Sequence, residues 1–266
     1  MPEALLIENR GEIEIVTLDR PEALNAIDPG LAQALSDHFA GLADRPETRV
    51  VILQGTGSAF CAGAELGSDA FASDGPGRTQ RQMAMQLLYS GVVRHMRACP
   101  QPIIGLIHGP ACGAGFSLAL ACDVRIAAED ARMNAAYFRV GLGGCDMGSG
   151  YLLPRLVGLS VASELLMTGN FIDAERGERV GLFSRVVPNA TLLESGLALA
   201  HDMLRGSPMG LRMTKQTLGQ AVDAPSLEAA LTLEDRQQVM LIGTEDHQEA
   251  VAAFREKRPP RYRPSS

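Results

Sequence analysis

The chain of 266 residues contains no tryptophan, and aromatic residues make up only 5% of it. Its five cysteines are odd in number and form neither a C-x-x-C pair nor a zinc-type spacing with histidine, which argues against a disulfide framework and a zinc module. No apolar run approaches the roughly 20 residues that cross a membrane, and the N-terminus lacks the apolar segment of a secretory signal. We therefore expect a soluble, cytoplasmic protein with reduced thiols.

Positive charge is also scarce, with 24 Lys and Arg against 31 Asp and Glu and a formal net charge of −7. This balance argues against a protein that neutralises nucleic-acid phosphates. Alanine and the 28 glycines are plentiful, and 46% of the residues are hydrophobic. Such a chain packs through small residues and close backbone contacts, and it is long enough to bury a sizeable core.

Strand-like and helix-like segments alternate along the first half of the chain. Asp28-Pro29 is a helix start signal, and residues 55–77 form a long loop rich in Gly, Ser and Asp. Helical patterns dominate from Ser160 onward, which predicts an α/β body followed by a helical C-terminal region without a flexible linker. The expected strands are 13–18, 50–54, 103–107 and 123–127; the expected helices are about 31–42, 80–98 and 113–122, with later N-caps at Asp173, Ser207 and Thr244.

Two segments of small residues follow buried strands. Residues 108–123 read HGPACGAGFSLALACD and lead from a strand into a helix, whose first turn presents unpaired N–H groups. Residues 58–66 read SAFCAGAEL and offer free backbone groups in a loop. Both segments allow a ligand to approach the backbone closely, although small residues also serve simple helix–sheet packing.

Two familiar motifs are rejected. Gly55-Thr56-Gly57 lacks the third glycine of a dinucleotide fingerprint, since Phe60 stands at that place. Residues 115–119 resemble a serine-hydrolase elbow, but that motif requires its serine on the tight turn directly after a strand. Ser117 should instead lie inside the helix.

Taken together, the chain resembles the crotonase family, also called the enoyl-CoA hydratase/isomerase family. The matching pieces run in order through nearly the whole chain. They are DRPEALNAI (19–27), AFCAGAEL (59–66), HGPACGAGFSLALACD (108–123), LLPRLVG (152–158) and DHQEAVAAFREKRPP (246–260).

The resemblance implies an α/β spiral of β-β-α repeats with a helical C-terminal trimerisation region. We expect a spiral core over residues 1–200 and the trimerisation region over residues 201–266. The implied assembly is a homotrimer or a dimer of trimers. The implied substrate is an acyl-CoA thioester, as in fatty acid metabolism, with no metal, no redox cofactor, no nucleic acid and no membrane partner.

The resemblance also implies roles for particular residues. The N–H groups of Ala64 and Ala114 correspond to the oxyanion hole. Negative charge develops on the thioester oxygen in this chemistry, and preorganised N–H donors stabilise it. Lys257 corresponds to a phosphate partner, which a neighbouring subunit could supply. The positions that correspond to coenzyme A contacts are Glu22, Ala23, Leu24, Ala62, Glu65 and Leu66.

The acid–base residues depart from the family pattern. The two glutamates with which hydratases of this family add water correspond to Ser117 and Tyr137, and neither hydroxyl is a usable general base near neutral pH. Asp146 falls in a loop where isomerases, dehalogenases and synthases of the family place a functional aspartate. It could move protons, act as a nucleophile, or cap the following helix. Tyr137 could donate a hydrogen bond or fill space.

Three hypotheses about function follow. The leading one is an enoyl-CoA hydratase/isomerase-family enzyme that stabilises a thioester enolate and uses Asp146 as acid and base. The second is a non-catalytic acyl-CoA-binding protein that has lost the acids. The third is a hydrolase or dehalogenase with Asp146 as the nucleophile.

Overall fold

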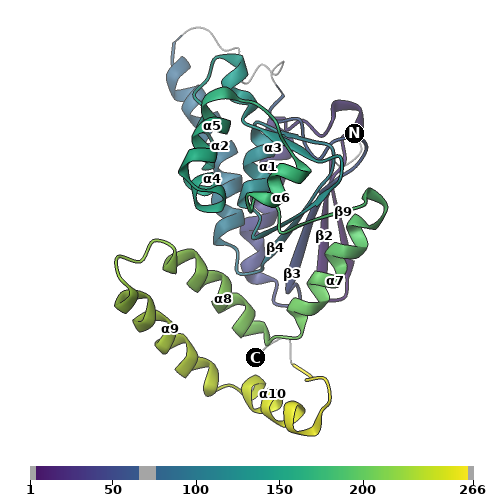
Figure 1. Ribbon diagram of the computed structural model, residues 1–266, viewed down its shortest axis with the longest axis vertical. Coiled ribbons are helices and arrows are strands. Elements are labelled where there is room, and N and C mark those ends of the chain that lie inside the picture. The colour runs from purple at the N-terminus through teal and green to yellow at the C-terminus, as the bar shows by residue number, and fades with distance from the viewer. Residues whose placement is uncertain (1–3, 66–75, 263–266) are drawn as a thin grey trace.

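The computed structural model describes residues 4–65 and 76–262. Its centre is a six-stranded sheet in the order β1-β2-β3-β4-β6-β9 (Figure 1). The β1–β2 pair is antiparallel, and every later pair in this sheet is parallel. The strands are β1 (Leu5–Arg10), β2 (Ile13–Leu18), β3 (Val50–Gly55), β4 (Ile103–Ile107), β6 (Val124–Ala128) and β9 (Arg185–Val187).

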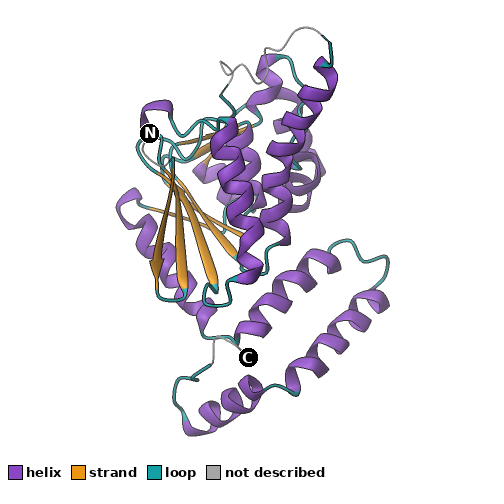
Figure 2. Cartoon of the chain, turned by 180° about the vertical axis from the view of Figure 1, so that it is seen from behind, coloured by secondary structure: helices purple, strands orange, loops and turns teal. Residues whose placement is uncertain are grey.

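The middle strands are buried on both faces, which explains their nearly continuous apolar sequences. Along β2, Val16 and Leu18 belong to the core under helices α1 to α3, whereas Ile13 and Ile15 belong to a second core under α7. Figure 2 shows helices on both sides of the strands. The body helices are α1 (Pro29–Gly41), α2 (Arg78–Ala98), α3 (Ala114–Ala121), α4 (Ser149–Val157), α5 (Leu159–Thr168), α6 (Ala174–Arg179) and α7 (Leu192–Leu204).

A second, smaller layer crosses one end of the large sheet. It contains β5 (Pro110–Cys112), β7 (Arg132–Asn134) and β8 (Ile172–Asp173). Isolated parallel bridges join Cys61 to Ala111 and Ile27 to Ala64, and they extend this layer. Successive turns of the chain thus contribute to the large sheet, then to the small layer, and return through a helix. The expected α/β spiral is confirmed.

The C-terminal region is helical, as expected, and extends away from the body (Figure 1). It comprises α8 (Pro208–Ala221), α9 (Leu227–Ile242) and α10 (Glu245–Glu256). Helix α7 covers the second face of the sheet through residue 204, so the boundary expected at residue 200 falls inside a helix that belongs to the body. Within the described ranges, no helix is both long and apolar enough to span a membrane.

The helix starts follow the capping signals in the sequence. The side chains of Asp28, Asp173, Ser207 and Thr244 each accept a hydrogen bond from the N–H group three residues later. Each bond satisfies one N–H that the helix itself leaves unpaired.

Candidate functional site

The loop after β3 is held between two other segments at the carboxyl end of the sheet. On one side the Ala62 N–H donates to the Leu24 carbonyl (2.9 Å), and the Glu65 N–H donates to the Ile27 carbonyl (2.9 Å). On the other side the Cys61 carbonyl accepts from the Cys112 N–H (2.9 Å). The loop is therefore fixed by main-chain bonds on both edges.

The first turn of α3 packs directly against this loop. A Cβ placed on Gly115 would lie 2.3 Å from the Cys61 carbonyl oxygen, so only glycine permits this approach. A Cβ placed on Gly63, which has φ +107°, would lie 3.5 Å from the Ala114 nitrogen. The residue after Gly63 is Ala64, so the two predicted amide donors lie on adjoining chain segments.

Neither of these two amides is used by the fold. Within residues 4–65 and 76–262, the N–H groups of Ala64 and Ala114 donate to no acceptor, although the neighbouring Ala62, Glu65 and Gly113 N–H groups all do. Ala114 is the first residue of α3, where the helix leaves its N–H groups unpaired and carries the positive end of its dipole. The two N–H groups are thus available to an external acceptor.

Hydroxyl groups lie one helical turn beyond Ala114. Ser117 is fully buried inside α3, as expected, and its Oγ donates to the Asp146 carbonyl (3.1 Å). The Tyr137 hydroxyl donates to Ser149 Oγ (2.5 Å), and Ser149 Oγ accepts from the Asp146 N–H (3.0 Å). Tyr137 therefore does more than fill space: it donates a hydrogen bond in a network that fixes the backbone of Asp146.

Burial determines the ionisation of Tyr137. Loss of water contact raises its pKa to about 12, partly offset by hydrogen bonds with Ser149 and Ser117. The phenol consequently remains protonated near neutral pH and can serve only as a donor or a neutral partner there. Its ring also lies against the turn before Ala114, since a Cβ placed on Gly113 would be 3.7 Å from Tyr137 Cδ1.

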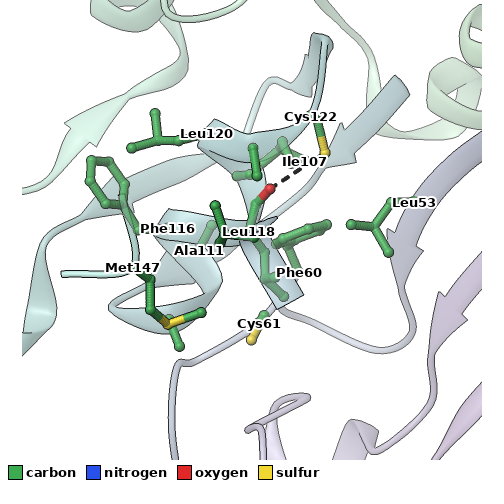
Figure 3. Close-up of a cluster of buried hydrophobic side chains, with 14 of the residues drawn as sticks. Leu53, Phe60, Cys61, Ile107, Ala111, Phe116, Leu118, Leu120, Cys122 and Met147 are labelled. Carbon is green, nitrogen blue, oxygen red and sulfur yellow. Dashed lines mark hydrogen bonds between the residues drawn. The ribbon is translucent and has the colours of Figure 1, made fainter. Parts of the chain in front are cut away.

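Asp146 is half-buried and does not cap the next helix. The N-cap of α4 is Gly148, and no side chain bonds there, so the capping interpretation of Asp146 is wrong. Its Oδ1 instead accepts from the Met147 N–H (2.7 Å) and from Gln86 Nε2 on α2 (2.5 Å). Met147 itself lies with Cys61 and Phe116 in the buried cluster around α3 (Figure 3). The carboxylate therefore bonds to α2 and to the loop before α4, while the main-chain carbonyl of Asp146 bonds to Ser117 on α3.

The positions expected to contact coenzyme A lie on two segments that are joined by the bond from the Ala62 N–H to the Leu24 carbonyl. Glu22, Ala23 and Leu24 lie in and after a short 3-10 helix (Pro21–Ala23), and Leu24 is 45% exposed beside Ala62. Glu65 Oε2 pairs with Arg20 Nη2 (3.0 Å). Leu66 lies outside the described residues.

Lys257 lies elsewhere in the chain. It is exposed at the C-cap of α10, in the C-terminal region, whereas Ala64 and Ala114 follow the carboxyl ends of β3 and β4. The residues after α10 return to the opposite end of the sheet, where the Tyr262 ring faces the Arg49 guanidinium before β3 (5.8 Å). A single chain thus does not bring Lys257 to the other predicted residues.

Three residues that support the site were missed. Asn25 has a positive φ (56°) and is fully buried; its Nδ2 donates to the carbonyls of Thr56 and Ala59 (both 2.8 Å). Arg20 joins Glu65 to Asp28 (3.0 Å to each carboxylate). For Asn25 a signal existed, because asparagine tolerates left-handed backbone better than most residues. No sequence signal indicated the partners of Arg20 and Gln86, because those partners are distant in the sequence.

Comparison with known proteins places this chain in a family. The family model described as enoyl-CoA hydratase/isomerase matches residues 8–265. A Mycobacterium bovis protein named "Probable enoyl-CoA hydratase echA12" is 38% identical over 260 residues, covering 96% of this chain and 91% of that protein.

Solved structures agree with this match. An enoyl-CoA hydratase from Bacillus anthracis has a TM-score of 0.91 at 30% identity, with 98% of this chain and 99% of that chain covered. An enoyl-CoA hydratase from Polaromonas sp. JS666 has a TM-score of 0.90 at 33% identity, with coverage of 97% and 99%. The chain belongs to the enoyl-CoA hydratase/isomerase family, the crotonase family.

Proposed function

We propose that this protein is an acyl-CoA enzyme that holds a thioester enolate with the N–H groups of Ala64 and Ala114 and moves protons with Asp146. The reaction that fits best is migration of a double bond in an enoyl-CoA. The observation that carries the proposal is the contact between the Gly63–Ala64 turn and the first turn of α3, with both amides unpaired.

The two amides suit a thioester oxygen that gains negative charge. Preorganised donors act without reorganising during the reaction, and loss of one such donor typically costs about 3 kcal/mol of transition-state stabilisation. Both donors here belong to the main chain, held by the packing of Gly115 against Cys61 and by the bonds on either side of the loop.

We assign proton transfer to Asp146 because the nearby side chains of Ser117 and Tyr137 are hydroxyl groups. Ser117 and Tyr137 stand where hydratases carry glutamates, and hydroxyl groups do not take protons from carbon near neutral pH. Asp146 supplies a carboxylate, and its backbone is bonded to Ser117, one turn beyond Ala114 on α3, and to Ser149 at the start of α4. We therefore favour isomerisation over the two-glutamate addition of water.

The proposed steps balance without a cofactor. Asp146 removes a proton from Cα of a 3-enoyl-CoA, and the C–H electrons delocalise into a dienolate whose oxygen accepts the two N–H bonds. The protonated Asp146 then returns the proton to Cγ. The double bond moves from the 3,4 to the 2,3 position, and no atom is gained or lost.

Substrate binding and assembly complete the proposal. Coenzyme A would lie along Glu22, Ala23 and Leu24 beside the loop from Ala62 to Leu66. We further propose a homotrimer or dimer of trimers, supported by large apolar side chains that α8–α10 leave exposed in one chain. Lys257 would then meet coenzyme A phosphates on a neighbouring subunit. The exposed side chains are Leu218, Val222, Leu227, Leu231, Val239, Met240, Ile242 and Phe254.

A panel of saturated acyl-CoAs and 2- and 3-enoyl-CoAs, assayed for binding and for products, tests this function. Asp146→Asn should retain binding and lose turnover by about 10²–10⁴-fold. The control is Asp37→Asn on the exposed face of α1, which should retain both. Full turnover in Asp146→Asn contradicts the proposal. Binding without turnover in the wild type supports a binding protein, and a covalent adduct on Asp146 after rapid quench supports a nucleophile.

A further inference from the structure

The two oxygens of Asp146 have different surroundings. Oδ1 accepts from Gln86 Nε2 (2.5 Å) and from the Met147 N–H (2.7 Å). Among residues 4–65 and 76–262, no donor bonds Oδ2. Two donors lower the basicity of the oxygen that they share, so Oδ2 is the oxygen better able to accept a proton.

The alternation of core-facing and exposed residues along α2 places Gln86 where it can reach Asp146. Met85 and Leu88 pack against the main core, whereas Gln86 is exposed on another face. Met83, three residues before Gln86, is its neighbour on the helix surface, and Leu87 is the neighbour of Met83 four residues on; the two side chains are 56% and 49% exposed. The amide of Gln86 thus holds the carboxylate beside an uncovered apolar strip that suits an acyl chain.

We propose that Gln86 is a positioning residue that occupies Oδ1 of Asp146 and leaves Oδ2 as the base. This inference rests on the proposed function, since it assumes that Asp146 moves the proton. The Met147 N–H is fixed by the backbone, so it cannot by itself prevent rotation of the carboxylate. Gln86, on α2, donates a second hydrogen bond to the carboxylate, and the two bonds together fix the orientation of the carboxylate.

Replacing Gln86 by methionine removes the donor at nearly constant volume. Misplacement of a catalytic group by about 1 Å can cost up to 10²-fold, and we expect a loss of about tenfold in kcat with KM unchanged within about twofold. The matched control is Gln33→Met, because Gln33 Nε2 donates to Asp37 Oδ1 (2.7 Å) on the exposed surface of α1. It should leave both constants unchanged.

A variant that adds a negative charge at position 86 tests the proposal through the pH dependence of kcat, which a purely structural role of Gln86 would leave unchanged. Gln86→Glu places a second carboxylate against Asp146, which disfavours its ionised form. The low-pH limb of the kcat profile should therefore move upward by about one pH unit. Two titratable groups close to Asp146 are Tyr137, which stays protonated below its pKa of about 12, and the thiol of Cys145. Measurement in a Cys145→Ser background removes that thiol.

Solvent exchange provides a second assay. Incorporation of deuterium from D₂O into the acyl chain, followed by NMR, reports proton removal even when no net product forms. The expected result is slower exchange in Gln86→Met with unchanged acyl-CoA binding. Full exchange and kcat in Gln86→Met, with Asp146→Asn inactive, overturns this inference alone. Loss of acyl-CoA binding in Gln86→Met also overturns it, while full activity of Asp146→Asn overturns the proposed function and this inference together.

Discussion

Lys215 on α8 and Asp123, just before β6, form a buried ion pair with Nζ and Oδ2 2.9 Å apart. Lys215 Nζ also donates to the carbonyls of Met96 (3.0 Å) and Gln101 (2.8 Å). The cation thus neutralises a carboxylate and meets the negative end of the α2 dipole. One side chain therefore attaches the C-terminal region to the body.

Lys215→Met should lower the free energy of unfolding by about 2 kcal/mol, because it leaves the Met96 and Gln101 carbonyls with only the weakly donating Cys99 thiol, while Arg97 still pairs with Asp123. Urea denaturation measures the change. Arg155→Met, which breaks the solvent-exposed pair with Asp223, is the matched control and should have little effect. Equal effects of the two substitutions would show that Lys215 does not anchor α8.

Gly115→Ala should separate the two unpaired amides, because the new Cβ would meet the Cys61 carbonyl at 2.3 Å. We expect acyl-CoA affinity to fall at least tenfold and stability to drop by about 1–3 kcal/mol, the usual cost of overpacking. Isothermal titration with a saturated acyl-CoA measures the affinity. Gly219→Ala, on α8 where the added Cβ meets nothing within 4 Å, should preserve affinity. Unchanged binding in Gly115→Ala would remove the main support for the proposed function.

Stability should fall at alkaline pH. Burial raises the pKa of Cys61, Cys122 and Tyr137 to about 12 each, while unfolded thiols and phenols ionise near pH 8.5 and about 10. Between these values the folded state holds protons that the unfolded state has released, so raising the pH favours unfolding. Denaturation at pH 7, 9 and 10.5 tests this slope. Tyr137→Phe should reduce the loss of stability between pH 9 and pH 10.5, and an equal loss in that variant would refute the contribution of Tyr137.

Cys145 should be the thiol that alkylates first. It is the exposed cysteine, and burial raises the pKa of Cys61, Cys99, Cys112 and Cys122, which suppresses their thiolates. Iodoacetamide and mass spectrometry should find one modified site, absent in Cys145→Ser. Because Cys145 adjoins Asp146, a bound acyl-CoA should slow the modification. Equal rates with and without acyl-CoA would argue against an acyl site here.

Much of the body could be predicted from local patterns. The apolar runs at 50–54 and 103–107 became buried parallel strands, and the four capping residues begin helices where expected. Strand β1 was missed because most of its side chains are exposed, so burial imposes no apolar pattern on them. The short strands β5, β7 and β8 contain only two or three residues, too few to show a period.

The site was harder to predict because its geometry depends on contacts distant in sequence. The small residues around 63 and 113–115 indicated close backbone approach, and the fold brings those segments together. The role of Asp146 as a cap was a local inference, and it failed because Gly148 begins the helix instead. The Gln86–Asp146 bond spans 60 residues of sequence, and no spacing rule could reveal it.

The unpaired N–H groups at positions 64 and 114 belong to the backbone, so nearly any residue type placed there would retain them. In the proposed function, the groups that would distinguish one reaction from another are instead side chains, those of Ser117, Tyr137 and Asp146. If the proposal holds, substitution of those side chains would alter proton transfer and leave the two main-chain donors in place. A new reaction on this fold would then require the substitution of only a few side chains.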